Sequence, residues 1–157
     1  MPDIPQKPRF YQTQVRVRFA DCDPAGIVFY PRYFEMFNGL VEDWFRSALH
    51  APFTEIVTQR GWGLPTVHLE ADFVAPSRFD ETLFATLTVN SLGTSSMGLD
   101  IVLRGSDRSS DKDKDDRVRG KVVLVLIDRA SHRAIPWPND LRARILAFQT
   151  SDSLQEI

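Results

Sequence analysis

Residues 21–31, DCDPAGIVFYP, set the layout of this chain because they join a tight turn to a long apolar segment. Pro24 fixes its own φ and keeps Asp23 out of the helical region, and Gly26 gives the backbone the freedom to turn back. Pro31 suits the first position of a helix, where a missing N–H costs nothing. The stretch therefore predicts a stiff turn that holds Asp23 immediately ahead of a helix.

The predicted start of this helix, near Tyr30, brings a second chemical group to the turn. The first N–H groups of a helix lack acceptors and carry the positive end of its dipole, so they can stabilise an oxyanion. If the turn folds back over them, one turn carries both a reactive carboxylate, Asp23, and the groups that polarise a carbonyl. The alternative is that Asp21 and Asp23 only form or cap the turn, which is the usual role of aspartates beside Pro and Gly.

Outward from the turn, the apolar pattern predicts the remaining elements. Residues 11–20 alternate as a strand does, whereas from Pro31 to about Leu49 apolar residues recur at helical spacing over a broad surface. We expect a short helix and turn over 51–62, strands over 67–73, 83–90, 97–103 and 118–127, a hairpin connection at 91–96, and a short helix over 141–148. This order predicts an α+β fold in which an antiparallel sheet wraps one long helix.

Two local patterns make the prediction more specific. In the strand over 67–73, the apolar residues Val67, Leu69, Ala71 and Phe73 alternate with polar ones, so these four are expected to share one face. The segment 106–117 has almost no apolar residue and is expected to be a mobile, solvated loop. Its aspartates lack the spacing of a calcium loop, so no metal site is expected there.

The composition is that of an ordinary globular protein. The chain has 157 residues, 43% of them hydrophobic and 25% charged, which predicts one domain over 1–157, with loosely ordered tails at 1–10 and 149–157. A net charge of -2 argues against a general nucleic-acid binder. The first ten residues lack the apolar core of a signal peptide, and no apolar run is long enough to span a bilayer. We expect no membrane partner.

Cysteine usage fits a reducing compartment. Cys22 is the only cysteine, so an intramolecular disulfide and a cysteine-based zinc site are both excluded, and we expect a cytoplasmic protein. No histidine lies near Cys22 in the sequence, which favours a small buried filler over a nucleophile.

The wider motif, RFADCDPAGIVFYPRY at 18–33, resembles the signature of the 4-hydroxybenzoyl-CoA thioesterase family of hotdog-fold enzymes. Weaker matches at 59–67, 71–73 and 133–138 extend the resemblance over most of the chain. It implies an acyl-CoA thioesterase for an aromatic or short acyl group. Coenzyme A is then part of the substrate, and no separate cofactor or metal is expected. The family usually pairs two protomers with active sites at their interface, which implies a homodimer or a dimer of dimers, the latter a homotetramer.

The resemblance also implies roles for five residues. Asp23 would be the catalytic nucleophile or general base, and the Tyr30 N–H would polarise the thioester carbonyl. Ile27, Asn38 and Arg133 would contact the substrate. Asn38 stands where relatives that hydrolyse 4-hydroxybenzoyl-CoA carry an aspartate, so a preference for the 4-hydroxy group is an open question. Arg133 matches a basic position near the CoA site, with an ordinary exposed arginine as the alternative.

Two other functions remain as alternatives. One is a non-catalytic acyl-thioester binder in which Asp23 only shapes the turn. The other is a hotdog hydratase or dehydratase, whose chemistry normally needs a histidine near the helix start. None occurs between Val15 and Leu49, so this alternative ranks below the thioesterase.

Overall fold

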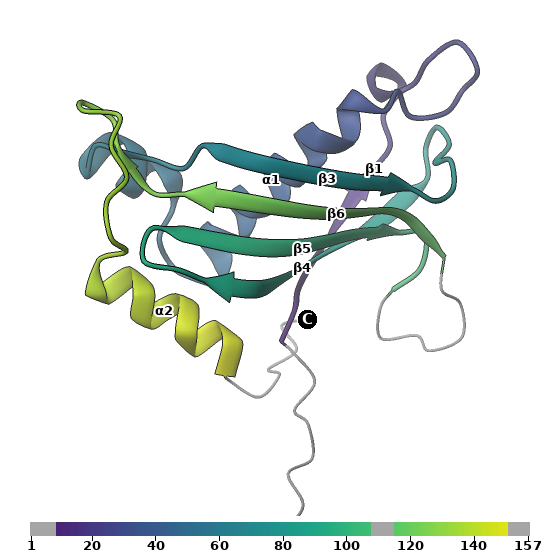
Figure 1. Ribbon diagram of the computed structural model, residues 1–157. Helices are drawn as coiled ribbons and strands as arrows, with labels where there is room; N and C mark the ends of the chain where they lie inside the picture. The colour runs from purple at the N-terminus through teal and green to yellow at the C-terminus, as the bar shows by residue number, and fades with distance from the viewer. Residues whose placement is uncertain (1–8, 108–114, 151–157) are drawn as a thin grey trace, which may run out of the picture.

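The computed structural model describes residues 9–107 and 115–150, in which an antiparallel sheet curves around one long helix (Figure 1). The elements in chain order are β1 (Tyr11–Arg16), η1 (Phe19–Asp21), α1 (Pro31–Ser47), η2 (Thr54–Gln59), β2 (Trp62–Gly63), β3 (Thr66–Phe73), β4 (Thr82–Leu92), β5 (Ser96–Arg104), β6 (Asp116–Val125), β7 (Ile127–Asp128) and α2 (Asn139–Thr150). This order confirms the predicted α+β arrangement.

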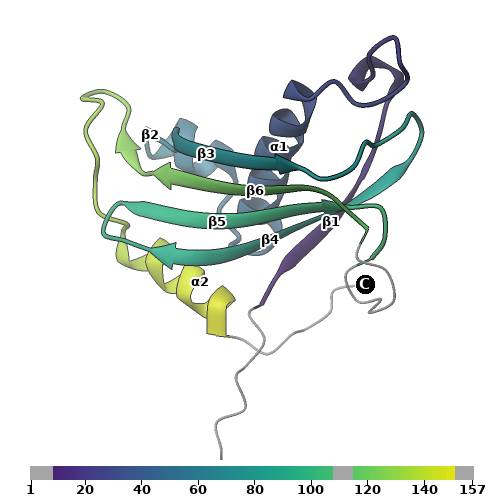
Figure 2. The ribbon, with the colours of Figure 1, turned by 45° about the vertical axis from the view of Figure 1, so that its right-hand side comes forward.

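The main sheet has five strands in the order β1-β4-β5-β6-β3, and every neighbouring pair is antiparallel. Helix α1 crosses one face of this sheet (Figure 2). Strands β1 and β3 form its two edges, and β2 pairs with β7 in a separate ribbon. Among the described residues no helix is both long and apolar enough to cross a membrane.

Helix α1 begins where the sequence predicts, with Tyr30 at the N-cap and Pro31 in the first turn. Its buried side chains cover a broad surface, which the apolar pattern predicted: Tyr33, Met36, Phe37, Leu40, Val41, Trp44 and Phe45. The helix ends at Ser47, close to the expected end, and His50 then takes a left-handed φ of 52°.

Gly120 in β6 lets α1 approach the sheet, because a Cβ added there would lie 2.8 Å from Cζ of Phe37. Gly120→Ala is therefore expected to lower the free energy of unfolding by about 1–3 kcal/mol. Gly39→Ala on α1, where an added Cβ meets nothing within 4 Å, should raise it by about 0.5–1 kcal/mol. Urea unfolding of both variants measures these changes. Equal stability of Gly120→Ala and the unmodified protein would contradict a close contact between Phe37 and Gly120.

Strand β3 differs from the prediction in one respect that matters for the site. Thr66 pairs with Leu124 and His68 with Val123, so Val67 is an extra residue in a β-bulge. The extra residue interrupts the predicted alternation of the strand at Val67. Val67 is 59% exposed.

Other boundaries also shifted. β1 ends at Arg16 instead of continuing to residue 20, and Phe19, in the following turn, is 81% exposed. β6 begins at Asp116, inside the segment 106–117 predicted as a loop, and α2 continues to Thr150. The rest of the predicted tails and loop, at 1–8, 108–114 and 151–157, lies outside the described residues.

Candidate active site

Residues 21–29 form a tight hairpin that ends at the N-terminus of α1. The Asp23 N–H donates to the Ile27 carbonyl at 2.9 Å, and the Gly26 N–H donates to the Asp23 carbonyl at 2.9 Å. Gly26 has a φ of 78°, which glycine adopts without steric cost. The predicted stiff turn ahead of the helix is confirmed, and its return strand leads directly into α1.

The two oxygens of the Asp23 carboxylate have different surroundings. Oδ1 accepts hydrogen bonds from the Ala25 N–H at 2.9 Å and the Ile27 N–H at 3.5 Å, which closes the turn. Oδ2 has no hydrogen-bond donor among residues 9–107 and 115–150. One oxygen therefore shapes the turn, and the other is free for chemistry.

The backbone N–H of Tyr30 has no acceptor in the described part of the chain. Tyr30 already has helical angles, with φ of -52° and ψ of -34°. The next residue, Pro31, has no N–H to contribute. The N–H groups of Arg32 and Tyr33, in the first turn of α1, donate to the Phe29 and Tyr30 carbonyls at 2.9 and 3.2 Å. The Tyr30 N–H is thus available to a carbonyl oxygen.

Asp21 and Cys22, also in the motif, have structural partners. Oδ2 of Asp21 accepts the Arg18 N–H at 2.9 Å, which is the capping role considered from the sequence. The Cys22 thiol is half-buried and donates to the Arg18 carbonyl at 3.6 Å. Desolvation, followed by the charges of Asp21 and Asp23, raises the pKa of this thiol. A raised pKa disfavours the thiolate, which argues against a nucleophilic role.

The connection between β3 and β4 supports the turn from the side. The Val28 N–H donates to the Ser77 carbonyl at 2.9 Å, and the Phe79 N–H donates to the Gly26 carbonyl at 3.3 Å. The hydroxyl of Tyr33 on α1 lies 3.0 Å from the buried Ser77 hydroxyl. The turn, the helix and the connection therefore hold one another in place.

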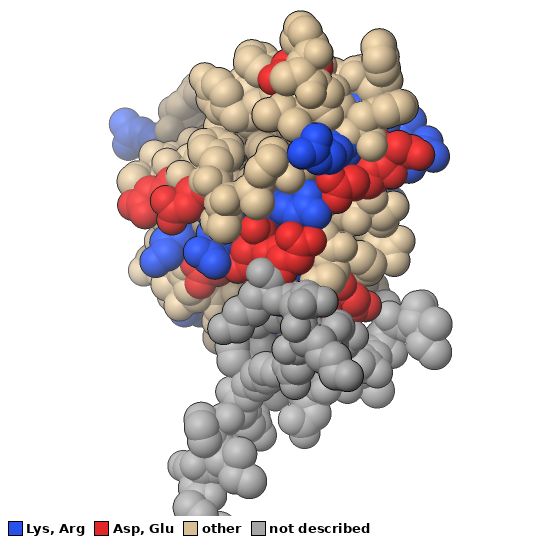
Figure 3. Space-filling view, turned by 90° about the vertical axis from the view of Figure 1, so that its right-hand side faces the viewer, with Lys and Arg blue, Asp and Glu red and all other residues tan. Residues whose placement is uncertain are grey.

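Arg117 anchors that connection to the sheet. Its guanidinium group, only 11% exposed, donates to the Pro76 carbonyl at 3.0 Å, to Glu81 at 2.8 Å and to Asp115 at 2.9 Å. These hydrogen bonds hold the pKa values of both carboxyls below their usual range. Figure 3 shows this end of the molecule, where acidic and basic side chains lie next to one another without forming a patch of one sign.

The lowered pKa of Glu81 gives a pH-dependent prediction. A carboxyl with a depressed pKa in the folded state stabilises the protein above its unfolded pKa, about 4.3, and loses this contribution as the pH falls through the folded pKa. We expect Glu81→Gln to cost about 1 kcal/mol at pH 7, since Glu81 is partly exposed, and progressively less below pH ~4. Urea unfolding at several pH values measures this.

Glu35→Gln is the matched control for Glu81→Gln. Glu35 pairs with Arg32 on the exposed surface of α1, with exposed fractions of 68% and 41%, so its removal should cost less than about 0.5 kcal/mol. A cost for Glu81→Gln that stays constant down to acid pH would contradict the role of the Glu81 charge.

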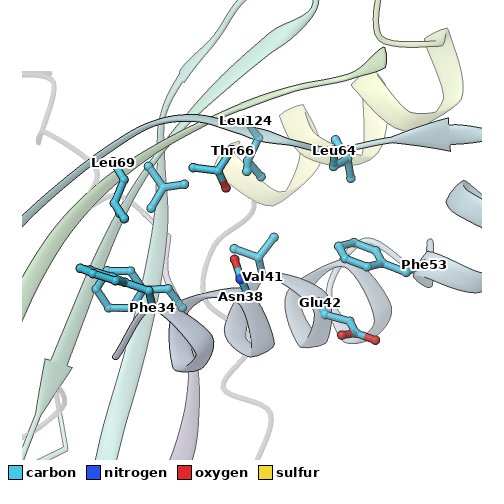
Figure 4. A pocket seen from close by; sticks show the side chains of 11 residues that line it. Phe34, Asn38, Val41, Glu42, Phe53, Leu64, Thr66, Leu69 and Leu124 are labelled. Atoms are coloured by element: carbon cyan, nitrogen blue, oxygen red, sulfur yellow. The ribbon is translucent and has the colours of Figure 1, made fainter. Parts of the chain in front are cut away.

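A cavity of about 480 Å³ lies between α1 and the β3 edge of the sheet (Figure 4). Its lining is mostly apolar and comprises Phe34, Phe37, Asn38, Val41, Glu42, Phe53, Leu64, Thr66, Leu69, Val122 and Leu124. Figure 4 shows the amide of Asn38 directed into the gap between helix and sheet, while the Glu42 carboxylate lies on the side away from the sheet. No sequence pattern indicates this cavity, because it depends on how α1 packs against β3.

The structure brings some of the predicted site residues together and separates others. Ile27 lies in the hairpin with Asp23 and pairs with Arg78. Asn38 is the only one of the five that lines the cavity. Arg133 is exposed in the turn that follows β7, and this turn and the Asp23 hairpin lie at opposite ends of the molecule in both ribbon views (Figures 1 and 2). Within one chain, Arg133 therefore does not reach the Asp23 hairpin.

Within the described ranges, the histidines and the acidic groups form no metal site. His68 is exposed and lies 2.9 Å from Glu70, and this hydrogen bond lowers the pKa of Glu70. No cluster of three or more potential metal ligands occurs within residues 9–107 and 115–150.

A sheet wrapped around one long helix is the hotdog fold, and solved structures of that fold superpose on this chain. The 4-hydroxybenzoyl-CoA thioesterase from Pseudomonas sp. strain CBS-3 matches with a TM-score of 0.75 and 27% identity, over 87% of this chain and 99% of that one. A 1,4-dihydroxy-2-naphthoyl-CoA thioesterase from Synechocystis matches with a TM-score of 0.75 and 23% identity, over 87% of this chain and 96% of that one. These matches confirm the predicted fold.

Residues 17–145 match the family model of the thioesterase-like superfamily, and the chain belongs to that superfamily. In sequence, it is 37% identical to the Pseudomonas 4-hydroxybenzoyl-CoA thioesterase over 71 residues, 45% of this chain and 50% of that protein. It is 33% identical to a Synechocystis 1,4-dihydroxy-2-naphthoyl-CoA hydrolase over 79 residues, 50% of this chain and 55% of that protein. The aligned part thus spans about half the length of these curated relatives. The predicted family resemblance is confirmed.

Proposed function

We propose that the protein is an acyl-CoA thioesterase that hydrolyses aromatic or short acyl-CoA thioesters to the free acid and CoA. The observation that carries this proposal is that two groups of the 23–30 segment have no hydrogen-bond partner among the described residues: Oδ2 of Asp23 and the N–H of Tyr30 at the start of α1. Membership of the thioesterase-like superfamily supports the reaction type. The named relatives, which act on aromatic acyl-CoA compounds, support the substrate class.

The reaction follows from these two groups. The Tyr30 N–H donates a hydrogen bond to the thioester carbonyl oxygen and stabilises the negative charge that develops there. We favour direct attack by Oδ2 of Asp23 on the carbonyl carbon, because that oxygen carries no hydrogen bond. The carbon–sulfur bond breaks, CoA leaves as the thiolate, and water then hydrolyses the acyl–aspartyl anhydride. General-base activation of water by Asp23 is the alternative route. Neither route needs a cofactor, because the thiolate is a good leaving group.

We further propose that a second copy of the chain completes the site. Tyr30 and Asn38 are eight residues apart on the helix, which places them about 12 Å apart along its axis. A benzoyl ring held at the Tyr30 N–H is shorter than this separation, which favours a ring contact with Asn38 of a second copy. Arg133 lies at the opposite end of the molecule from the Asp23 hairpin, so it too could contact the substrate only from a second copy of the chain.

Strand β3 supplies the surface for such a partner. It is an edge strand, whose unpaired N–H and C=O groups can pair with a further strand. Its apolar residues, and one just beyond it, are unusually exposed: Val67 59%, Leu69 39%, Phe73 51% and Val74 47%. Phe73 also contacts the exposed ring of Tyr30, with centroids 5.9 Å apart. Pairing of the β3 strands of two copies would bring the Asp23 hairpins and the cavities of both copies into one homodimer. Two such dimers would form the homotetramer.

The single cysteine and the net charge of -2 support a cytoplasmic enzyme that acts on a small molecule and not on nucleic acid.

The test is hydrolysis of an acyl-CoA panel by the purified full chain, with released CoA detected by a thiol reagent. We expect benzoyl-CoA and hydroxybenzoyl-CoA to be hydrolysed with kcat/KM of about 10⁴ M⁻¹ s⁻¹ or more, and long aliphatic acyl-CoA more slowly. Binding of benzoyl-CoA without CoA release would support the non-catalytic binder instead. Absence of both would overturn the proposal.

A further inference from the structure

The β-bulge at the start of β3 orients the Thr66 side chain toward the cavity. Thr66 pairs with Leu124 and Leu69 pairs with Val122, and all four residues line the cavity. In a regular strand, side chains three residues apart point to opposite faces. The extra residue at Val67 removes this difference, so that Thr66 and Leu69 both face α1.

The Thr66 hydroxyl faces the Asn38 amide across the cavity. Figure 4 shows both polar groups directed into the gap from opposite walls, one from β3 and one from α1. Neither side chain forms a hydrogen bond with another residue in 9–107 or 115–150. Apart from Glu42, whose carboxylate is turned away from the sheet, the rest of the lining is apolar.

The chemistry of this pair limits what the cavity accepts. A threonine hydroxyl and an asparagine amide each donate and accept hydrogen bonds, and neither is charged. A neutral hydroxyl substituent donates one hydrogen bond and accepts others, so it can satisfy both side chains at once. A bare ring would bury the two polar groups without partners, and a charged substituent would lose its hydration with no opposite charge in the gap.

We propose that Thr66 is a specificity residue that, together with Asn38, binds a neutral hydroxyl substituent on an aromatic acyl group. This inference rests on the proposed thioesterase function. Because Asn38 lies about 12 Å from Tyr30 along α1, the pair receives the acyl group of a thioester held at the turn of the second copy.

The experiment compares kcat/KM for benzoyl-CoA with that for its 2-, 3- and 4-hydroxy derivatives. We expect the unmodified protein to prefer at least one hydroxy isomer over benzoyl-CoA, and Thr66→Val to reduce this preference about tenfold. Valine keeps the branched shape and strand propensity of threonine and removes only the hydroxyl. Thr66→Ser, which keeps a hydroxyl, should retain most of the preference. Thr88→Val on β4, a residue outside the cavity, should leave all four rates unchanged.

A double substitution adds a second readout. If Thr66 and Asn38 hold the same hydroxyl group, the effects of Thr66→Val and Asn38→Ala on the preference are not additive. Urea unfolding shows whether each variant is folded at the assay temperature.

The outcomes separate the two proposals. Failure to hydrolyse any of the four thioesters would overturn the proposed function. Hydrolysis of benzoyl-CoA with no preference for a hydroxy isomer, or a preference that Thr66→Val leaves intact, would overturn the specificity role alone.

Discussion

Asp23→Asn is expected to lower kcat for benzoyl-CoA by about 10³-fold or more, with little change in stability. The asparagine side-chain oxygen can still accept the Ala25 N–H, as Oδ1 of Asp23 does at 2.9 Å. The turn therefore keeps its hydrogen bond. What is lost is the second, unpaired oxygen, since an amide nitrogen neither attacks the thioester nor accepts a proton from water. The substitution therefore separates the catalytic role of Asp23 from its role in forming the turn.

Asp21→Asn is the matched control for this variant. Asp21 lies two residues earlier in the same hairpin, and its carboxylate accepts the Arg18 N–H at 2.9 Å. We expect it to change kcat by less than about tenfold, because the introduced asparagine can make the same capping hydrogen bond. Stopped assays with CoA detection, together with urea unfolding, measure both effects. A folded Asp23→Asn protein that works as fast as the unmodified chain would remove Asp23 from the mechanism.

Val67→Asp should both separate the subunits and abolish most activity. Val67 lies on the β3 edge with 59% of its surface exposed, where we propose that a second copy packs. A carboxylate without a partner in an apolar interface costs about 2–5 kcal/mol, enough to reduce association and turnover roughly 10²-fold or more. Light scattering after gel filtration and the benzoyl-CoA assay measure the two effects.

Leu146→Asp on α2 makes the same change at an apolar residue that is 43% exposed and remote in sequence from β3. This control should leave the assembly and the activity unchanged. An unmodified protein that is fully active as a monomer would show that one chain is sufficient.

The turn and the helix could be predicted because their rules are local. Pro24, Gly26 and Pro31 restrict the backbone at their own positions, and the helical spacing of the apolar residues is visible along α1. The bulge in β3 could not be predicted, because Val67 continues the alternation of apolar and polar residues. Only the pairing with β6 shows that it is an extra residue.

The remaining differences between the predicted and the observed structure depend on contacts between residues that are distant in sequence. Asp116 and Arg117 belong to β6 although the segment before them is almost entirely polar, because Asp116 pairs with Arg104 of β5. The Arg117 side chain also pairs with Glu81, 36 residues away. The separation of Asn38 and Arg133 from Asp23 likewise follows from tertiary packing. The candidate residues could be predicted from the sequence. No sequence pattern indicates whether each residue contributes to the site of its own subunit or to that of a partner subunit.

The crystal structure of Asp23→Asn with bound benzoyl-CoA tests the central claim most directly, because slow turnover should preserve the thioester. We predict that its carbonyl oxygen lies about 3 Å from the Tyr30 nitrogen, with the substituted amide side chain of the turn beside the carbonyl carbon. The ring should lie next to Asn38 of the partner subunit. A thioester bound away from this turn, with the Tyr30 N–H facing solvent, would contradict the account.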